Sequence, residues 1–464
     1  MNLRVLGIEL RRSVAPWAGG IVLASALAFL YLLNGEWWRG TTAWTAQWTT
    51  LALWTRGLLF YLWPVAVGLG ALQGLRDHRS TMSELLASTP RPPRHRAAAS
   101  AGATTAALVS AFALVLLAGA VQVLGNTDYA HLGWLPIALV GALSLVAGAV
   151  LGMGAGRALP SPLTPPVLAM TAFVFTALLH STLGRTDTTA QTGMPSSEPN
   201  RLSLLSPAVQ EVRHALLTFP ASVNAGQAIW LLGMAVTGFA LLVAATRRGR
   251  LLALAPMAAA AALALLVLPS DPRRILVVDE AAAAPVCDGR VCVAETHRDR
   301  LAGLAGPGRD ALSRLHDALG EDAPDSVGEN TTVVPDGVVP RWSRERVLFT
   351  FDDETVADAR GEGLTAALIG RAMVPGCVPA GWSTLGADEY ARAVAVAWVV
   401  GGLTPLPGTP KTLSAEIDAQ ARPVWNELKA LPRSEQLARI DTMRRVALSC
   451  DGDALDALKG GTGR

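Results

Sequence analysis

Residue patterns for the common hydrolytic reactions are absent from this sequence. A P-loop needs G-x-x-x-x-G-K-[ST], and the nearest string, 408–412, has no glycine directly before Lys411. Neither the H-E-x-x-H pattern of zinc peptidases nor the G-x-S-x-G turn of serine hydrolases occurs. We therefore expect no enzymatic activity, cofactor or metal in this chain. We interpret His297 as a structural histidine. The acidic pairs Asp279-Glu280 and Asp352-Asp353 are interpreted as surface turns.

The four cysteines all lie in the C-terminal part of the chain, at Cys287, Cys292, Cys377 and Cys450. Four cysteines allow three pairings. We expect Cys287–Cys292, which closes the short turn CDGRVC, and Cys377–Cys450, which closes a long loop and contributes about 4 kcal/mol in the chain-entropy model. A zinc site is the alternative, although the cysteine spacing does not match a zinc ribbon. Since disulfides persist outside the cytoplasm, we expect this segment there.

The chain as a whole is strongly apolar, and its apolar runs precede the segment with the cysteines. Of the 464 residues, 51% are hydrophobic and only 16% are charged, which is too apolar for an ordinary soluble protein. The net charge of +2 identifies no partner, and no nucleic acid is expected. A lipid bilayer is the expected surrounding, because several apolar runs approach the roughly 20 residues that cross it. These runs are 15–33, 58–75, 101–124, 134–155, 167–183, 227–245 and 251–269, and the fifth, with His180, is the weakest.

Two segments beside the first apolar run have their own patterns. Residues 1–14 place leucines at helical spacing with arginines between them, which predicts an amphipathic helix on the membrane surface. A secretory signal peptide is the alternative. The segment after the run is rich in tryptophan, which fits an interfacial belt or a short re-entrant segment, or else the packing of an external helical hairpin. Its tryptophans are Trp37, Trp38, Trp44, Trp48 and Trp54.

The arginines between the apolar runs predict the orientation. With the N-terminus in the cytoplasm, the inner segments hold more arginines than the outer loops, as the positive-inside rule requires. Seven spans then place residues 270–464 outside the cytoplasm, in agreement with the cysteines. The inner arginines are Arg4, Arg11, Arg12, Arg76, Arg79, Arg91, Arg94, Arg96, Arg157, Arg247, Arg248 and Arg250, and the outer ones are Arg39, Arg56, Arg185, Arg201 and Arg213.

The patterns together predict a membrane all-α bundle of six to seven transmembrane helices, with a cytoplasmic N-terminus, followed by an extracytoplasmic α+β domain. Its parts are an interfacial helix at 1–14, a transmembrane domain at 15–269 and the external domain at 270–464. The transmembrane domain includes a cytoplasmic loop at 76–96 and an external loop at 184–226.

Strands in the external domain are expected at 275–278, 291–294 and 347–351. Helices are expected at 301–319, with an interruption at Gly306-Pro307-Gly308, and at 356–373, 387–400, 414–431 and 434–449. The apolar run 393–403 is too short to span a bilayer and predicts a buried core helix.

Glycines recur every four residues in the fourth apolar run, at Gly148, Gly152 and Gly156. Such spacing lets two helices approach closely. Packing inside the bundle and dimerisation explain it equally well.

The loop 76–96, RDHRSTMSELLASTPRPPRHR, is polar and basic and predicts one short amphipathic helix near Met82–Ala87. Its stretch SELLASTP, Ser83–Pro90, follows the second apolar run and is similar to the E-L-L-x-S-T-P stretch of type-2 ABC exporter permeases. The architecture of the first 250 or so residues also resembles that family, whereas the motif covers about eight residues.

The resemblance implies a permease subunit in the plasma membrane that exports an unknown substrate. In that family the stretch forms a coupling helix that docks onto a separate cytoplasmic ATP-binding subunit, which holds ATP and magnesium. Two ATP-binding subunits need two docking loops, which implies a homodimer or a pair with a related permease. The docking residues implied here are Ser83, Glu84, Leu85, Leu86, Ser88, Thr89 and Pro90.

The chain departs from the family in two features. The family core has six spans, whereas this chain has a seventh and an external domain, which resembles one appended to permease-like proteins of actinobacteria. A membrane-anchored sensor or assembly protein, whose external domain binds a partner, is one alternative. An external enzyme of unrecognised type is another. A further alternative is that the loop 76–96 is a solvated basic loop whose arginines only follow the positive-inside rule.

Overall fold

The computed structural model describes residues 13–33, 35–38, 40–79, 93–181, 184–186, 196–198, 200–209, 214–271, 274–332, 341–377, 387–409 and 411–461. The chain forms two compact units. Unit 1 consists of Met1–Asn126, Ala130–Gly184 and Glu198–Val277. Unit 2 consists of Thr127–Tyr129, Arg185–Ser197 and Val278–Arg464.

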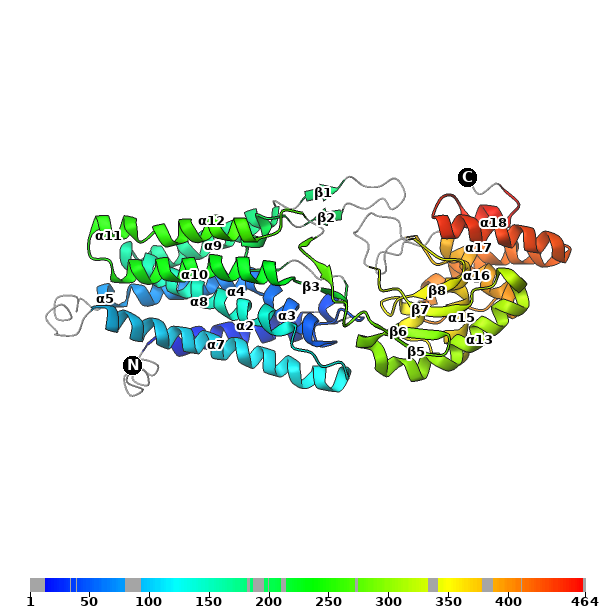
Figure 1. The fold of residues 1–464 in the computed structure, drawn as a ribbon, viewed down its shortest axis with the longest axis horizontal. Helices are drawn as coiled ribbons and strands as arrows, with labels where there is room; N and C mark the ends of the chain where they lie inside the picture. Colours follow the sequence, from blue (N-terminus) through cyan, green and yellow to red (C-terminus); the bar gives the residue numbers. More distant parts are fainter. Residues whose placement is uncertain are drawn as a thin grey trace. The chain divides into compact units, whose positions relative to one another are not determined.

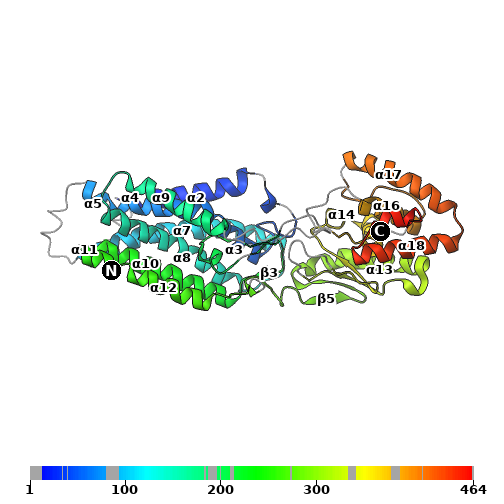
Figure 2. The same ribbon diagram turned by 90° about the horizontal axis from the view of Figure 1, so that it is seen from above.

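Unit 1 is a bundle of long helices that lie side by side (Figures 1 and 2). Among the residues that the structure describes, six helices are long and apolar enough to cross a membrane, or seven if α3 and α4, which are bent by 52°, form one span. These helices indicate a multi-pass membrane protein, and the weak fifth run is among them as α9. The helices are α2 (Ala15–Leu32), α3 (Trp48–Gly57), α4 (Leu59–Gly74), α5 (Arg76–Arg79), α7 (Pro93–Asn126), α8 (Trp134–Ala158), α9 (Thr164–Ser181), α10 (Ala221–Val243), α11 (Arg247–Leu252) and α12 (Ala255–Val267).

Consecutive long helices of unit 1 run in opposite directions. The backbone N–H of Val14, before α2, donates to Gln73 Oε1 near the end of α4 at 3.4 Å, while the rings of Phe29 and Tyr61 meet 5.8 Å apart at the other ends. The end of α4 also lies beside the start of α7, because Gln73 Nε2 donates to Ser100 Oγ at 3.0 Å. Alternation therefore gathers the arginines between the spans at one end, the basic end, defined by Arg76, Arg94, Arg96, Arg157, Arg247, Arg248 and Arg250.

The tryptophan-rich segment packs at the opposite end of the bundle. Trp44 is fully buried, and Trp54 Nε1 donates to the carbonyl oxygen of Thr42 at 2.6 Å. Ring contacts join Trp37 to Trp54 and Trp48 to Trp134, so these indoles pack against one another and against the spans. Short elements of unit 1 at this end are η1 (Glu36–Trp38), η2 (Ser203–Leu205) and β3 (Leu217–Thr218). Two short strand pairs lie at the boundaries of the two units in the sequence: β1 (Gly184–Thr186) pairs with β2 (Ser196–Glu198), and β3 pairs with β4 (Val277–Val278).

Unit 2 is an α+β fold around a four-stranded sheet, ordered β5-β6-β7-β8. The first two strands form an antiparallel hairpin, and the other two pairs are parallel. Val327, Val347 and Phe349 are buried in the core that the sheet shares with the helices, whereas Ser326 and Arg346 alternate with them along the strands. The strands are β5 (Pro285–Asp288), β6 (Val291–Ala294), β7 (Ser326–Glu329) and β8 (Arg346–Phe349).

The helical elements of unit 2 are η4 (Glu295–Arg300), α13 (Leu301–Leu319), η5 (Gly320–Asp322), α14 (Glu354–Ala357), α15 (Gly361–Met373), α16 (Ala387–Val400), α17 (Lys411–Ala430), α18 (Arg433–Ser449) and α19 (Ala454–Leu458). The short apolar run lies mostly in α16, a helix of the buried core, as its length predicted. The expected helix 356–373 is divided, because Gly361 adopts a positive φ of 50° where α15 begins.

The expected interruption at Gly306-Pro307-Gly308 is wrong, since α13 runs through it. A Cβ at Gly308 would overlap the side chain of Val291, so glycine lets α13 lie directly on β6. Buried Leu304, Ala311 and Leu315 hold this face against the sheet and offset the hydrogen bond that Pro307 removes.

Candidate functional site

The predicted docking residues lie outside the described residues, as does most of the predicted amphipathic helix at 1–14. These docking residues are Ser83, Glu84, Leu85, Leu86, Ser88, Thr89 and Pro90. The structure describes both flanks of their loop, which are α5 and the start of α7. Both flanks lie at the basic end, where Arg250 Nη1 of α11 also donates to the carbonyl oxygen of Ala158 at 2.8 Å. The two described flanks of the loop therefore lie beside the other basic connections.

The glycines Gly148, Gly152 and Gly156 of α8 face α4. A Cβ at Gly152 would overlap the carbonyl oxygen of Val67, and one at Gly156 would overlap that of Ala71. The contact is reciprocal, because a Cβ at Gly70 of α4 would overlap the carbonyl oxygen of Ala149. These glycines thus bring two helices of one chain into backbone contact.

Both predicted disulfides are confirmed. Cys287 pairs with Cys292 across the β5–β6 hairpin, where the two residues are direct neighbours in the strand register. Cys377, after α15, pairs with Cys450 at the end of α18, with Cα atoms 5.5 Å apart. All four cysteines of the chain are therefore oxidised.

His180 and Asp353, two titratable side chains singled out from the sequence, pack against or bond to neighbouring side chains. His180, in α9, lies with its ring 5.9 Å from that of Phe60. Asp353 is buried rather than part of a surface turn: it caps α14 by accepting from Thr355 N at 3.0 Å, and it forms an ion pair with Arg371. Burial, followed by repulsion from Arg392, lowers the pKa of Arg371 well below its usual range.

Arg56 requires a correction, because it was assigned to an outer loop. It lies in α3 and is fully buried inside unit 1. Its Nη2 donates to Gln227 Oε1 at 3.1 Å and to the carbonyl oxygen of Pro207 at 3.3 Å. The sequence carried a weak signal for this burial, since Arg56 sits within an otherwise apolar and aromatic stretch, LALWTRGLLFYLW.

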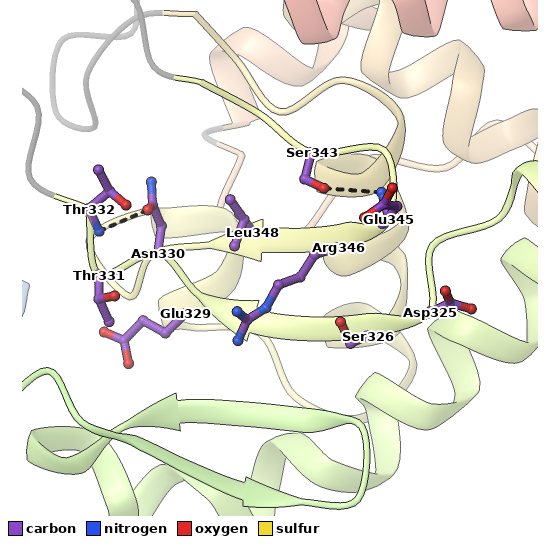
Figure 3. Close-up of a pocket in the computed structure, with 10 residues that line it drawn as sticks. All are labelled: Asp325, Ser326, Glu329, Asn330, Thr331, Thr332, Ser343, Glu345, Arg346 and Leu348. Atoms are coloured by element: carbon purple, nitrogen blue, oxygen red, sulfur yellow. Dashed lines mark hydrogen bonds between the residues drawn. The ribbon is translucent and has the colours of Figure 1, made fainter.

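A polar cavity of about 470 Å³ lies on the sheet of unit 2 (Figure 3). Arg346 reaches from β8 across β7, and a Cβ at Gly328 would overlap its guanidinium. Asp325, Glu329 and Glu345 make the lining mainly acidic, while hydroxyl and amide groups supply hydrogen-bond donors. Such a cavity has the groups to hold a small polar molecule. The remaining lining residues are Ser326, Asn330, Thr331, Thr332, Ser343 and Leu348.

Glu329, at the end of β7, joins this cavity to the buried His297. Its Oε1 lies 2.7 Å from His297 Nδ1, and its Oε2 accepts from the backbone N–H of Ala294 at 2.8 Å. Carboxylates hold imidazoles in this way both in catalytic sites and in purely structural ones. His297 is not among the cavity residues, so the pair fastens η4 and β6 to β7.

Replacement of Glu329 tests this fastening. Glu329→Ala leaves a buried N–H and an imidazole nitrogen without partners and is expected to reduce the free energy of unfolding by about 2–3 kcal/mol. Glu329→Gln can still accept from Ala294 and donate to the other histidine tautomer, so a loss of about 1 kcal/mol is expected. Thermal unfolding of the purified full chain measures both, with the exposed Glu345→Ala as control. Equal losses for the alanine and glutamine variants would contradict this role.

Searches against family models, curated proteins and solved structures find no match to this chain. Its class therefore rests on the fold itself. A bundle of six or seven apolar helices and a small α+β unit with two disulfides define it as a multi-pass membrane protein.

Proposed function

We propose that this chain is the membrane-spanning permease subunit of an ABC exporter in the cell membrane. It couples ATP hydrolysis by a separate subunit to outward transport. The observation that carries the proposal is the position of Ser83–Pro90. In the sequence this stretch lies between α5 and α7, and the described ends of these two helices that flank it lie at the basic end of the bundle, where a cytoplasmic ATP-binding subunit would meet it.

The directions of the helices support the topology. If α3 and α4 together form one span, seven alternating crossings put the segment before α2 and the segment after α12 on opposite sides of the membrane. Because arginines concentrate at the basic end, that end is cytoplasmic. Unit 2 then lies outside the cytoplasm, where its two disulfides persist.

The proposed mechanism uses the loop as a mechanical link. Leu85 and Leu86 fill an apolar groove on the ATP-binding subunit, and Glu84 forms an ion pair with it. Pro90 ends the helix and stiffens its exit. Closure of two ATP-binding subunits presses on two such loops, one from each chain of a homodimer or of a pair with a related permease. ATP and magnesium stay on the partner, since this sequence has no P-loop.

Charge placed on the two leucines tests the docking. The double variant Leu85→Asp/Leu86→Asp is expected to release a co-expressed ATP-binding subunit that the wild-type chain retains, because two carboxylates cannot enter an apolar groove without a large desolvation penalty. Co-purification and the ATPase rate of the complex measure the effect, and we expect a loss of at least tenfold in both.

The matched control is Leu159→Asp/Leu163→Asp. These leucines are also exposed and also lie in a connection at the basic end, between α8 and α9. The control chain should retain the subunit. If the variant at Leu85 and Leu86 retains it equally well, the proposed function is wrong.

A further inference from the structure

Arg56 is a cation buried inside the membrane unit, and the described residues supply no counter-ion to it. Its side chain is 0% exposed, and no described carboxylate forms an ion pair with it. A charge buried without a partner costs several kcal/mol in free energy of folding, and ionisable residues within membrane spans are rare for this reason. A chain that keeps arginine here is therefore expected to gain something from the charge.

The donors of Arg56 are only partly used. Its Nη2 donates to two neutral oxygens, those of Gln227 and Pro207, whereas its Nε and Nη1 find no acceptor among the residues that the structure describes. The ring of Phe219 lies 5.7 Å from the guanidinium carbon and supplies only a weak cation–π attraction. These two nitrogens, which are buried from solvent, could each form a strong charge-assisted hydrogen bond to an anion.

Pro207, which accepts from Arg56, belongs to the short segment 204–207 before α10. The segment lies in no sheet or long helix, and side chains of α10 bind two of its carbonyl oxygens. Gln227 Nε2 donates to Leu204 O, and Trp230 Nε1 donates to Leu205 O, both at 3.0 Å. Since Arg56 Nη2 donates to Pro207 O of the same segment, an anion that takes over the guanidinium would remove this hydrogen bond and leave those from Gln227 and Trp230.

We propose that Arg56 binds the anionic oxygens of an amphipathic ligand, a phosphodiester or a carboxylate, at this end of the bundle. The apolar part of the ligand lies along the lipid-facing helices, and its head displaces the carbonyl oxygen of Pro207 from the guanidinium. That this ligand is the exported cargo rests on the proposed function. Binding itself requires no ATP-binding subunit, so the two proposals can fail separately.

The test measures binding of defined anions to the purified full chain in a neutral detergent. Phosphatidylglycerol and oleate are the anionic probes, phosphatidylcholine is the zwitterionic probe, and inorganic phosphate tests whether a free anion suffices. We expect the two anionic lipids to raise the midpoint of thermal unfolding of the wild-type chain, and phosphatidylcholine to raise it much less. Equal shifts for anionic and zwitterionic lipids would overturn the proposal, and a shift with phosphate alone would show that the site needs no apolar tail.

Three variants locate the site. Arg56→Gln should weaken retention of the anionic lipids in native mass spectrometry at least tenfold, and Arg56→Lys, which keeps the charge, should restore most of it. Arg250→Gln, which removes an arginine at the basic end, should leave retention unchanged. Undiminished retention by Arg56→Gln would overturn the proposal. If Arg56→Gln does not fold, the proposal is tested by the lipid comparison on the wild-type chain and by Arg56→Lys. Equal shifts for anionic and zwitterionic lipids in both chains would overturn it.

An internal counter-ion would give a different result. Glu211 lies in the same connection between α9 and α10, outside the described residues. If Glu211→Gln lowers the unfolding midpoint of the wild-type chain but not that of Arg56→Gln, the chain itself supplies the anion and the proposal is wrong.

Discussion

Replacing Gly152 by alanine is expected to destabilise unit 1 by about 1–3 kcal/mol, because the added methyl group overlaps backbone rather than a side chain that could move. In α8 the new Cβ would meet the carbonyl oxygen of Val67 in α4. The two helices must then separate, and the neighbouring contacts at Gly70 and Gly156 open with them. Gly152→Leu should abolish recovery of folded chain.

The matched control is Gly20→Ala in α2, where nothing lies within 4 Å of the added Cβ. Alanine favours a helix over glycine by up to about 1 kcal/mol, so this control should be neutral or slightly stabilising. Thermal unfolding and size-exclusion profiles of the purified chains measure both variants. If Gly152→Ala leaves the unfolding midpoint unchanged and only alters the oligomeric state, the glycines serve dimerisation instead.

Removing the disulfide between Cys377 and Cys450 should be the most damaging change in unit 2. The bond closes a loop with a sequence separation of 73, and the chain-entropy model assigns it about 4 kcal/mol. Cys287–Cys292 spans a separation of only 5, inside a hairpin that the β5–β6 pairing already holds, and the same model assigns it about 2 kcal/mol.

The paired serine variants, Cys377→Ser/Cys450→Ser and Cys287→Ser/Cys292→Ser, separate the two bonds. Denaturant unfolding of the full chain, followed without reductant, should show the larger loss for the first pair. Adding reductant to the wild-type chain should reproduce the combined loss. If Cys377→Ser/Cys450→Ser lowers the free energy of unfolding no more than Cys287→Ser/Cys292→Ser does, packing of α18 and α19 holds unit 2 together without the Cys377–Cys450 disulfide.

The long apolar helices could be predicted because roughly 20 consecutive apolar residues leave few alternatives. The disulfide pairing could also be predicted, since Cys287 and Cys292 flank a tight turn. The strand β7 was missed, because its four residues, Ser326–Glu329, become a strand only through distant partners in β6 and β8.

The buried polar groups show a second limit of sequence reasoning. Arg56 was placed in a loop because arginine between apolar runs usually marks one, and its burial depends on Gln227 and Pro207, more than 150 positions away. Asp353 was read as surface acidity, and its burial depends on Arg371 in another helix. Charge pattern predicts which side of a membrane a loop faces, but only tertiary contacts decide which charges are enclosed.

The glycine contacts of α8 extend to both of its sides. A Cβ at Gly154 would overlap the carbonyl oxygen of Gly238 in α10, just as one at Gly152 would overlap α4. Helix α8 thus touches α4 on one side and α10 on the other, backbone to backbone at these glycines. In α9 and in the α11–α12 span, by contrast, only 17% of the residues in the most apolar 18-residue stretch are buried inside the protein. We therefore expect α4, α8 and α10 to move as one body, whereas α9 and the α11–α12 span can shift more independently. A displacement at the end of α4 would then be passed on to α8 and α10.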